Sequence, residues 1–228
     1  MCSEVQAVDD LLVIEQTISK SMKEHYSHLL HTGEQIQAYI QANKKLVVEQ
    51  KLISKAIVTR MFYANRDSRE YNDNIFRDKK PSLADFFTES VGLYTSAFLK
   101  NIDGFHLVME KLFQKKRPDI LIMKNGKVEY VLEVKIDMGY SRYEWEELYD
   151  KKVTAYGLLP ERVCLIVLSS SNWYGFEKEK PLNWISLSKK HPNDAKKFPL
   201  YQVGKELLFN DFDDFIEPLL LSIEETIR

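Results

Sequence analysis

The feature that most constrains the fold is a pair of short apolar runs joined by Asn125-Gly126, in the stretch RPDILIMKNGKVEYVLEVKID. Asn-Gly between two such runs is a strong signal for a tight turn between antiparallel strands. Both runs carry charges: Asp119 begins the first, and Glu133 and Lys135 interrupt the second. Burying a charge costs free energy unless something pairs with it. These side chains therefore either pair with one another or hold a ligand.

The register of this hairpin decides whether the three charges can meet. Glu133 and Lys135 are two residues apart, so on a strand their side chains point to the same face. A strict two-residue turn puts Asp119 opposite Leu132 and on the other face, because a slip of one residue reverses every side chain. A shared ligand requires Asp119 opposite Glu133, which needs a longer loop or a β-bulge. We therefore predict an irregular hairpin, or a kink at Pro118.

Two carboxylates and an ammonium group on one surface suit a hard divalent cation, with the lysine beside a water or a phosphate oxygen. A bound metal lowers the pKa of its water and polarises a phosphoryl oxygen, and a nearby lysine orients the water or takes its proton. Such a site would suit phosphodiester hydrolysis, which needs a nucleophilic hydroxide and neutralisation of the charge on the phosphate. A structural alternative stays open, in which Glu133 and Lys135 form an ion pair on an exposed face and Asp119 caps a turn.

The rest of the chain indicates an α/β core with an α-helical N-terminal extension. Apolar residues at helical spacing predict a helix over residues 11–30, ended by Gly33, and a second helical stretch over residues 34–64. The polar segment 65–81 is predicted to be a linker or a long loop. We therefore expect an N-terminal extension and linker, residues 1–81, and an α/β domain, residues 82–228.

Within the second domain the elements alternate between helices and strands. Helices are predicted over 83–100 and 143–156, strands over 105–113, 119–123, 127–136, 162–170 and 183–188, and mostly helix over 204–227.

Pro118-Asp119, thirteen intervening residues and then Glu133-x-Lys135 resemble the motif of the PD-(D/E)XK nuclease superfamily. The resemblance covers residues 82–187 and implies the fold of restriction endonucleases, a mixed β-sheet core flanked by helices. It implies that Asp119 and Glu133 bind Mg²⁺ or Mn²⁺ and that Lys135 is the catalytic lysine. In that family a helix before the strands often supplies a further glutamate, and Glu89 matches by position.

Some members of the family add Gln-x-x-x-Tyr on the helix after the motif. This chain has Lys152 and Tyr156 there, so the tyrosine matches and the glutamine does not. Trp173 and Tyr174 are further candidates for substrate contact, because aromatic rings near lysines can stack on bases.

Composition narrows the class of protein. The chain has 228 residues, a formal net charge of −2 and two cysteines. This charge argues against a non-specific polyanion binder, and two cysteines give no disulfide framework. We find no signal peptide and no apolar run of transmembrane length, so we expect a cytoplasmic, reducing location and no membrane partner.

We expect a magnesium- or manganese-dependent endonuclease that acts on DNA rather than RNA, with a homodimer or larger assembly through the N-terminal helices. One alternative is a cap-snatching-type RNA endonuclease of a viral polymerase; many of these have an upstream ligand histidine, for which His106 or the cluster at 25–31 could serve. The other is a catalytically silent nuclease-fold binding or assembly module.

Overall fold

The computed structural model describes residues 10–14, 27–61, 83–137, 142–170, 183–188, 200–203, 206–209 and 214–228. At its centre is a mixed five-stranded sheet in the order β1-β2-β3-β4-β5. The first three strands run antiparallel and the last two are parallel to β3. The strands are β1 (Phe105–Met109), β2 (Ile120–Lys124), β3 (Lys127–Lys135), β4 (Val163–Val167) and β5 (Trp184–Ser186).

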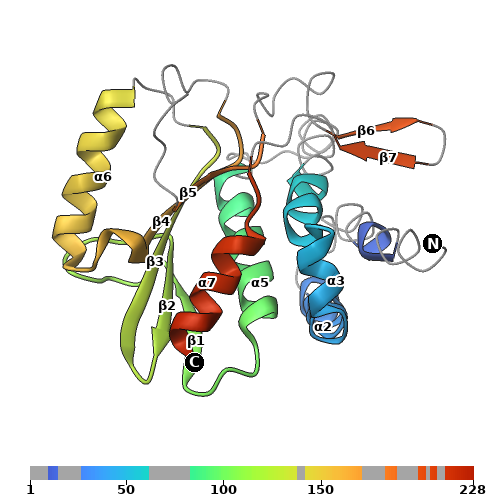
Figure 1. The fold of residues 1–228 in the computed structure, drawn as a ribbon, viewed down its shortest axis with the longest axis horizontal. Helices are drawn as coiled ribbons and strands as arrows, with labels where there is room; N and C mark the ends of the chain where they lie inside the picture. Colours follow the sequence, from blue (N-terminus) through green and yellow to red (C-terminus); the bar gives the residue numbers. More distant parts are fainter. Residues whose placement is uncertain are drawn as a thin grey trace.

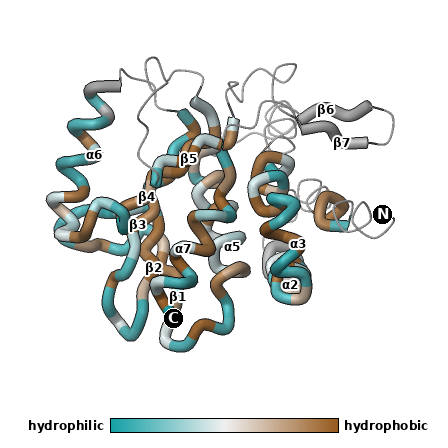
Figure 2. Tube along the Cα trace, in the orientation of Figure 1, coloured by the Kyte–Doolittle hydropathy of each residue, from teal (hydrophilic) through white to brown (hydrophobic). Residues whose placement is uncertain are grey.

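Helices cover both faces of this sheet (Figure 1). α6 (Arg142–Tyr156) lies on one face, and α5 (Leu83–Leu99) and α7 (Glu217–Ile227) lie on the other. Because side chains alternate along a strand, the strands contribute side chains to two hydrophobic cores, one on each face of the sheet. β4 is buried at every position, as expected for a strand covered on both faces, and Figure 2 shows hydrophobic colours along it. The expected α/β class, with a mixed sheet flanked by helices, is therefore confirmed.

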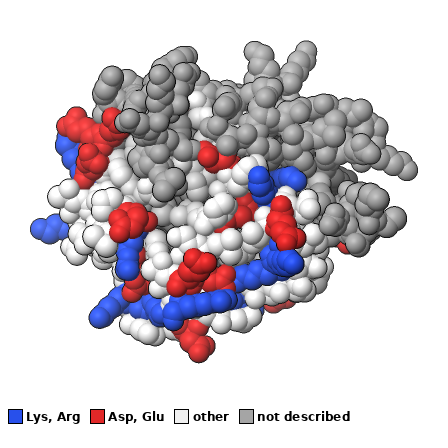
Figure 3. Space-filling view, in the orientation of Figure 1, with Lys and Arg blue, Asp and Glu red and all other residues white. Residues whose placement is uncertain are grey.

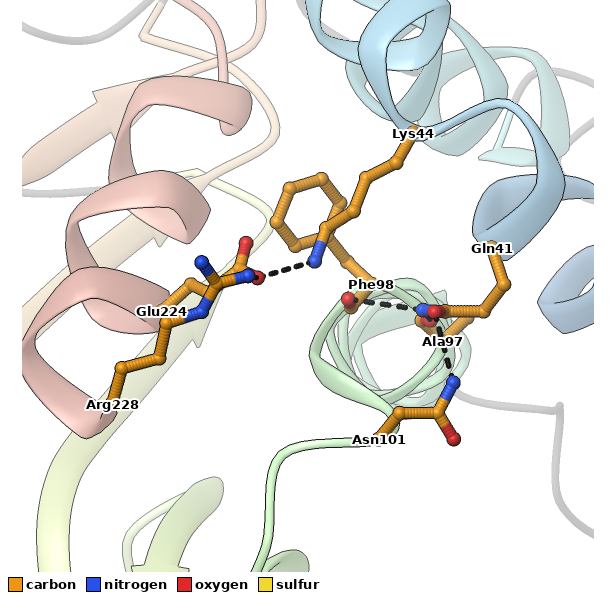
Figure 4. Close-up of polar contacts among 7 residues, drawn as sticks. All are labelled: Gln41, Lys44, Ala97, Phe98, Asn101, Glu224 and Arg228. Atoms are coloured by element: carbon orange, nitrogen blue, oxygen red, sulfur yellow. Dashed lines mark hydrogen bonds and ion pairs between the residues drawn. The ribbon is translucent and has the colours of Figure 1, made fainter.

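The N-terminal helices pack onto the α5 face of the sheet. α2 (Ser27–Ala42), α3 (Lys44–Glu49) and the helical residues 52–61 contribute to the same hydrophobic core as α5 and α7. Polar contacts reinforce this packing, because the Gln41 side-chain amide donates to the carbonyls of Ala97 (2.8 Å) and Phe98 (3.2 Å) at the end of α5 (Figure 4). The described helices of the extension thus share a core with the α/β part, and the domain boundary at residue 82 stays a prediction.

Three details differ from the sequence-based expectations. Gly33 lies inside α2 and does not end a helix; a Cβ there would lie 3.4 Å from Leu93 Cδ1, so the glycine allows α2 to approach α5 closely. The strand expected over 105–113 ends at Met109, and a tight turn follows. Residues 206–209 form β7 (Glu206–Phe209), which pairs with β6 (Leu200–Val203) in a separate two-stranded sheet and is not helical.

None of the helices in the described ranges is both long and apolar enough to cross a membrane.

Candidate active site

A β-bulge in β3 sets the register that the candidate site needs. Next to the Asn125-Gly126 turn, Met123 pairs with Val128, as a strict two-residue turn requires. One step further Ile122 pairs with Tyr130, so Glu129 is the extra residue and the register shifts by one. The prediction of an irregular hairpin is thus confirmed.

The bulge aligns the charged positions of the two strands. Beyond it Ile120 pairs with Leu132, and continuing this register puts Asp119 opposite Glu133. Val131 packs in the core under α6, whereas Leu132 packs in the core on the α5 side. Glu133 alternates with Leu132 and therefore belongs to the α6 face.

Asp119 lies just before β2 and bonds to both the backbone and a side chain of β3. Its Oδ2 accepts a hydrogen bond from the backbone N–H of Val134 (2.7 Å) and lies 3.4 Å from Lys135 Nζ. The side chains of Asp119 and Lys135 are 25% and 33% exposed, so solvent can reach this end of the site. The neighbouring backbone is tied to the end of β1, because Glu110 N–H donates to the Asp119 carbonyl (3.1 Å).

Glu133 lies deeper and is held by two side chains of α6. The residue is 3% exposed, and its carboxylate accepts hydrogen bonds from Lys152 Nζ on one oxygen and from the Tyr156 hydroxyl on the other. Lys152 and Tyr156 are four residues apart, so one face of α6 presents both to β3. Lys152 and Tyr156, both predicted from the sequence as site residues, therefore bind the candidate ligand Glu133.

The environment keeps Tyr156 protonated. Burial raises the pKa of its hydroxyl far above the usual value, and the hydrogen bond to Glu133 and the negative charges of Glu133 and Asp119 raise it further. Tyr156 is thus a permanent hydrogen-bond donor to Glu133.

The four charged groups of this cluster balance. Asp119 and Glu133 carry two negative charges, and Lys135 and Lys152, each in contact with one of them, carry two positive charges. Proteins typically bind Mg²⁺ through the oxygens of one or two carboxylates, and the ion keeps several of its water ligands. The donor set therefore fits such an ion, and the ion would compete with the two ammonium groups.

Other predicted site residues lie apart from this cluster. Glu89 is an exposed residue of α5, the helix on the opposite face of the sheet. Within the described ranges, no three or more His, Cys, Asp or Glu side chains form a group that could hold a metal, and Glu89 as a metal ligand stays a prediction. His106 pairs with Met123 on β2, roughly 13 Å along the strand from the level of Asp119. Trp173 and Tyr174 lie outside the described residues.

One element beside the site was missed by the sequence-based reasoning. The segment between β1 and β2 forms a turn whose Phe113 ring stacks on the Tyr156 ring, with centroids 6.0 Å apart. The sequence signal was present in the run EKLFQKKR, which is rich in lysine and arginine, but its apolar residues were assigned to a strand.

Comparisons of the chain with protein-family models, with curated proteins and with solved structures found no match.

Proposed function

We propose that this protein is a divalent-metal-dependent nuclease that hydrolyses phosphodiester bonds, with DNA as its substrate. The observation that carries the proposal is the bulge at Glu129, which puts Asp119 opposite Glu133 and on the face of β3 that also carries Lys135. A bulge interrupts the ladder of the strand pair, and bulges are frequent next to active sites, where they redirect a side chain. The structural alternative, an ion pair between Glu133 and Lys135, is not the pairing found here, because Lys135 pairs with Asp119 and Glu133 pairs with Lys152.

The residues of the cluster have separate roles in this proposal. Asp119 and Glu133 hold Mg²⁺ or Mn²⁺, and the ion supplies a water of lowered pKa and neutralises charge on the phosphate. Lys135 has three donors and no acceptor, so it does not ligate the ion while charged. It orients the attacking water or takes its proton. The Tyr156 hydroxyl and the Val134 N–H fix the orientation of the two carboxylates.

The element order supports the finer fold proposal, a restriction-endonuclease-like core. A helix, three antiparallel strands, a second helix and a strand parallel to the third follow one another as α5, β1, β2, β3, α6 and β4. This order, together with the Pro118-Asp119 and Glu133-x-Lys135 pattern, is what the resemblance to PD-(D/E)XK nucleases rests on.

The test is a cleavage assay with three substrates. Purified protein is incubated with Mg²⁺ or Mn²⁺ and single-stranded DNA, duplex DNA or RNA, next to the Asp119→Ala variant. Asp103→Ala, an exposed aspartate at the other end of β1, is the matched control. We expect metal-dependent cutting of DNA that Asp119→Ala loses and Asp103→Ala keeps. If only RNA is cut, the substrate of the proposed nuclease is RNA and not DNA.

One observation favours a second candidate, a catalytically silent binding or assembly module. Both carboxylates are already paired with lysines, and Lys152 stands where some family members have a neutral glutamine. Under this candidate the cluster is a satisfied structural network. Absence of cutting of all three substrates by the wild-type protein, in both metals, would favour the module and contradict the nuclease.

A further inference from the structure

The turn between β1 and β2, residues 110–117, is a strongly basic element beside the candidate active site. It contains Lys111, Lys115, Lys116 and Arg117 against a single acid, Glu110, in a chain whose formal net charge is −2. All of its residues except Phe113 are exposed. Within the described part of the chain, none of the four cations forms an ion pair with an acid. Positive charge is therefore concentrated and available at this one point.

The turn has a defined shape. Phe113 and Lys116 form a β-bridge with reciprocal backbone hydrogen bonds of 2.8 and 2.9 Å. The two residues between them, Gln114 and Lys115, have φ of 50° and 61°. Such two-residue turns favour Asn-Gly, because the left-handed region costs other residues roughly 1–2 kcal/mol each. A lysine at a strained tip where glycine would be easier points to a functional reason for the side chain.

The turn is attached to the candidate site at two points, in its middle and at its C-terminal end. Phe113 stacks on Tyr156, whose hydroxyl donates to Glu133. At the other end Arg117 is followed by buried Pro118 and then by Asp119, so its Cα lies within about 7 Å of the Asp119 Cα. The cations are thus held next to the two carboxylates by packing and by chain connectivity.

We propose that the turn at residues 110–117 binds the sugar-phosphate backbone of a nucleic acid strand and leads that strand to the Asp119–Glu133 site. Exposed lysines and arginines bind phosphates by charge and by release of counterions, without reading sequence. This inference rests on the proposed function in its substrate class, but it concerns binding and requires no metal. Binding by the turn can therefore be tested independently of catalysis.

The test measures binding in EDTA, where cleavage does not occur. Fluorescence anisotropy of labelled single-stranded DNA, duplex DNA and RNA is recorded over a range of salt concentrations. The variant is Lys115→Gln with Lys116→Gln. The matched control is Lys45→Gln with Lys100→Gln, two exposed lysines outside the turn. We expect the turn variant to bind about tenfold more weakly, and the slope of log K against log salt to fall by about 0.7–0.9 for each phosphate that the variant no longer neutralises. The control keeps the wild-type affinity and slope.

A second variant separates binding from folding. Lys115→Gly removes a charge but relieves the left-handed backbone, so its melting temperature is expected to be at least that of the wild type while its affinity falls. If the turn were only structural, affinity and melting temperature would change together. Equal affinity of the wild type and both turn variants overturns the inference, and so does absence of binding by the wild type. Turn-dependent binding without metal-dependent cleavage upholds the inference and contradicts the nuclease.

Discussion

Two buried glutamates of this molecule look alike at first and differ in what surrounds them. Glu133 on β3 is 3% exposed and binds Lys152 and Tyr156, and Glu224 on α7 is 4% exposed and binds Lys44 and Arg228. Each carboxylate is therefore removed from water and offset by a lysine and one further donor. By burial and pairing alone the two sites would be equivalent.

The neighbours of the two carboxylates separate them. Glu224 ties α7 to the start of α3, with Lys44 Nζ at 2.6 Å and also 4.5 Å from the centre of the Phe98 ring (Figure 4). It borders a cavity of about 630 Å³ that Lys100 and Lys124 also line. Figure 3 shows Lys and Arg side chains gathered across the lower part of this face, where α7 ends in Figure 1.

Glu133 instead has Asp119 and Lys135 on its own face of the sheet, in a register that exists because of a bulge. The cavity beside Glu224 also has a second acid, Asp103, but this aspartate is an exposed loop residue. Next to Glu133, in contrast, a carboxylate and an ammonium group are held on the same face of one sheet, where a divalent cation and a water can be bound. The comparison teaches that an acid held in register on the same face of the sheet, and not burial or pairing, distinguishes the candidate active site.

The largest expected effect comes from exchanging each glutamate for its neutral isostere. Glu133→Gln should abolish metal-dependent cleavage, because it removes a ligand charge while keeping the shape of the side chain. Glu224→Gln should leave cleavage unchanged. It should lower the free energy of unfolding by only about 1 kcal/mol, because the ion-pair partners of Glu224 are partly exposed. This loss corresponds to a decrease of roughly 2–4 °C in melting temperature. Cleavage assays and thermal melts of both variants check this pair. Equal loss of cleavage in the two variants would contradict the distinction.

Lys135 should matter for catalysis without being needed for metal binding. Lys135→Ala is expected to lower the cleavage rate by about a hundredfold or more, the range for loss of a positioned acid–base group. The same variant should keep or increase the thermal stabilisation by Mg²⁺, because a positive charge next to Asp119 has been removed. Lys127→Ala, at the exposed start of β3, is the control. If Lys135→Ala cleaves at nearly the wild-type rate, the ion pair between Lys135 and Asp119 has only a structural role.

Lys152 tests whether an ammonium group competes with the metal at Glu133. Lys152→Gln should reduce the Mg²⁺ concentration for half-maximal stabilisation by up to about fivefold, because a partly exposed ion pair contributes about 0.2–1 kcal/mol. Lys151→Gln is the matched control, since Lys151 pairs with Glu147 on the surface of α6 at 2.5 Å. A weaker Mg²⁺ response in Lys152→Gln than in this control would show that Lys152 supports the metal site.

A third buried glutamate extends the comparison to a carboxylate held by uncharged donors. Glu217, 1% exposed, accepts hydrogen bonds from the Ser54 N–H (3.0 Å) and hydroxyl (2.7 Å). Burial raises the pKa of its carboxyl above the usual 4.5, and the Ser54 hydrogen bonds only partly offset this. The folded protein then binds this proton more tightly than the unfolded chain does. The stability contributed by the uncharged form is present below pH 4.5 and is lost as the pH rises through the raised folded-state value.

The matching experiment is a set of thermal melts from about pH 5 to about pH 8. Glu217→Gln should gain stability relative to the wild type as the pH rises, by a few degrees at most, because the amide keeps the side-chain shape without the buried charge. Glu225→Gln, an exposed position of the same helix, should parallel the wild type. A difference between Glu217→Gln and the wild type that does not change with pH would contradict the pKa assignment.

Much of the central sheet could be predicted because its signals are local. Asn125-Gly126 identified the turn, and the continuous apolar run around β4 identified a strand buried on both faces. The need for an irregular hairpin followed from the spacing of Asp119 and Glu133. The position of the bulge could not be predicted, because the sequence around Glu129 carries no local signal that distinguishes this residue from its neighbours. In the structure Glu129 forms an ion pair with Arg162 (2.5 Å), a contact between residues 33 positions apart.

The elements that were predicted wrongly depend on tertiary packing or are too short to show a periodic pattern. Gly33 carries the sequence signal of a helix end, and only the contact with Leu93 explains a glycine inside α2. The four residues of β7 are too few to distinguish a strand from a helix by periodicity.

Metal-dependent thermal stabilisation tests the central claim, a divalent-cation site at Asp119 and Glu133, most directly, because it needs no knowledge of the substrate. At a hundred times the dissociation constant, Mg²⁺ or Mn²⁺ should stabilise the wild-type fold by about 2.7 kcal/mol. For a chain of this size that is roughly 5–10 °C in melting temperature. The account predicts that Asp119→Ala abolishes the shift and that Asp103→Ala keeps it. Absence of a shift in the wild type, or a shift that survives Asp119→Ala, would contradict a metal site at these residues.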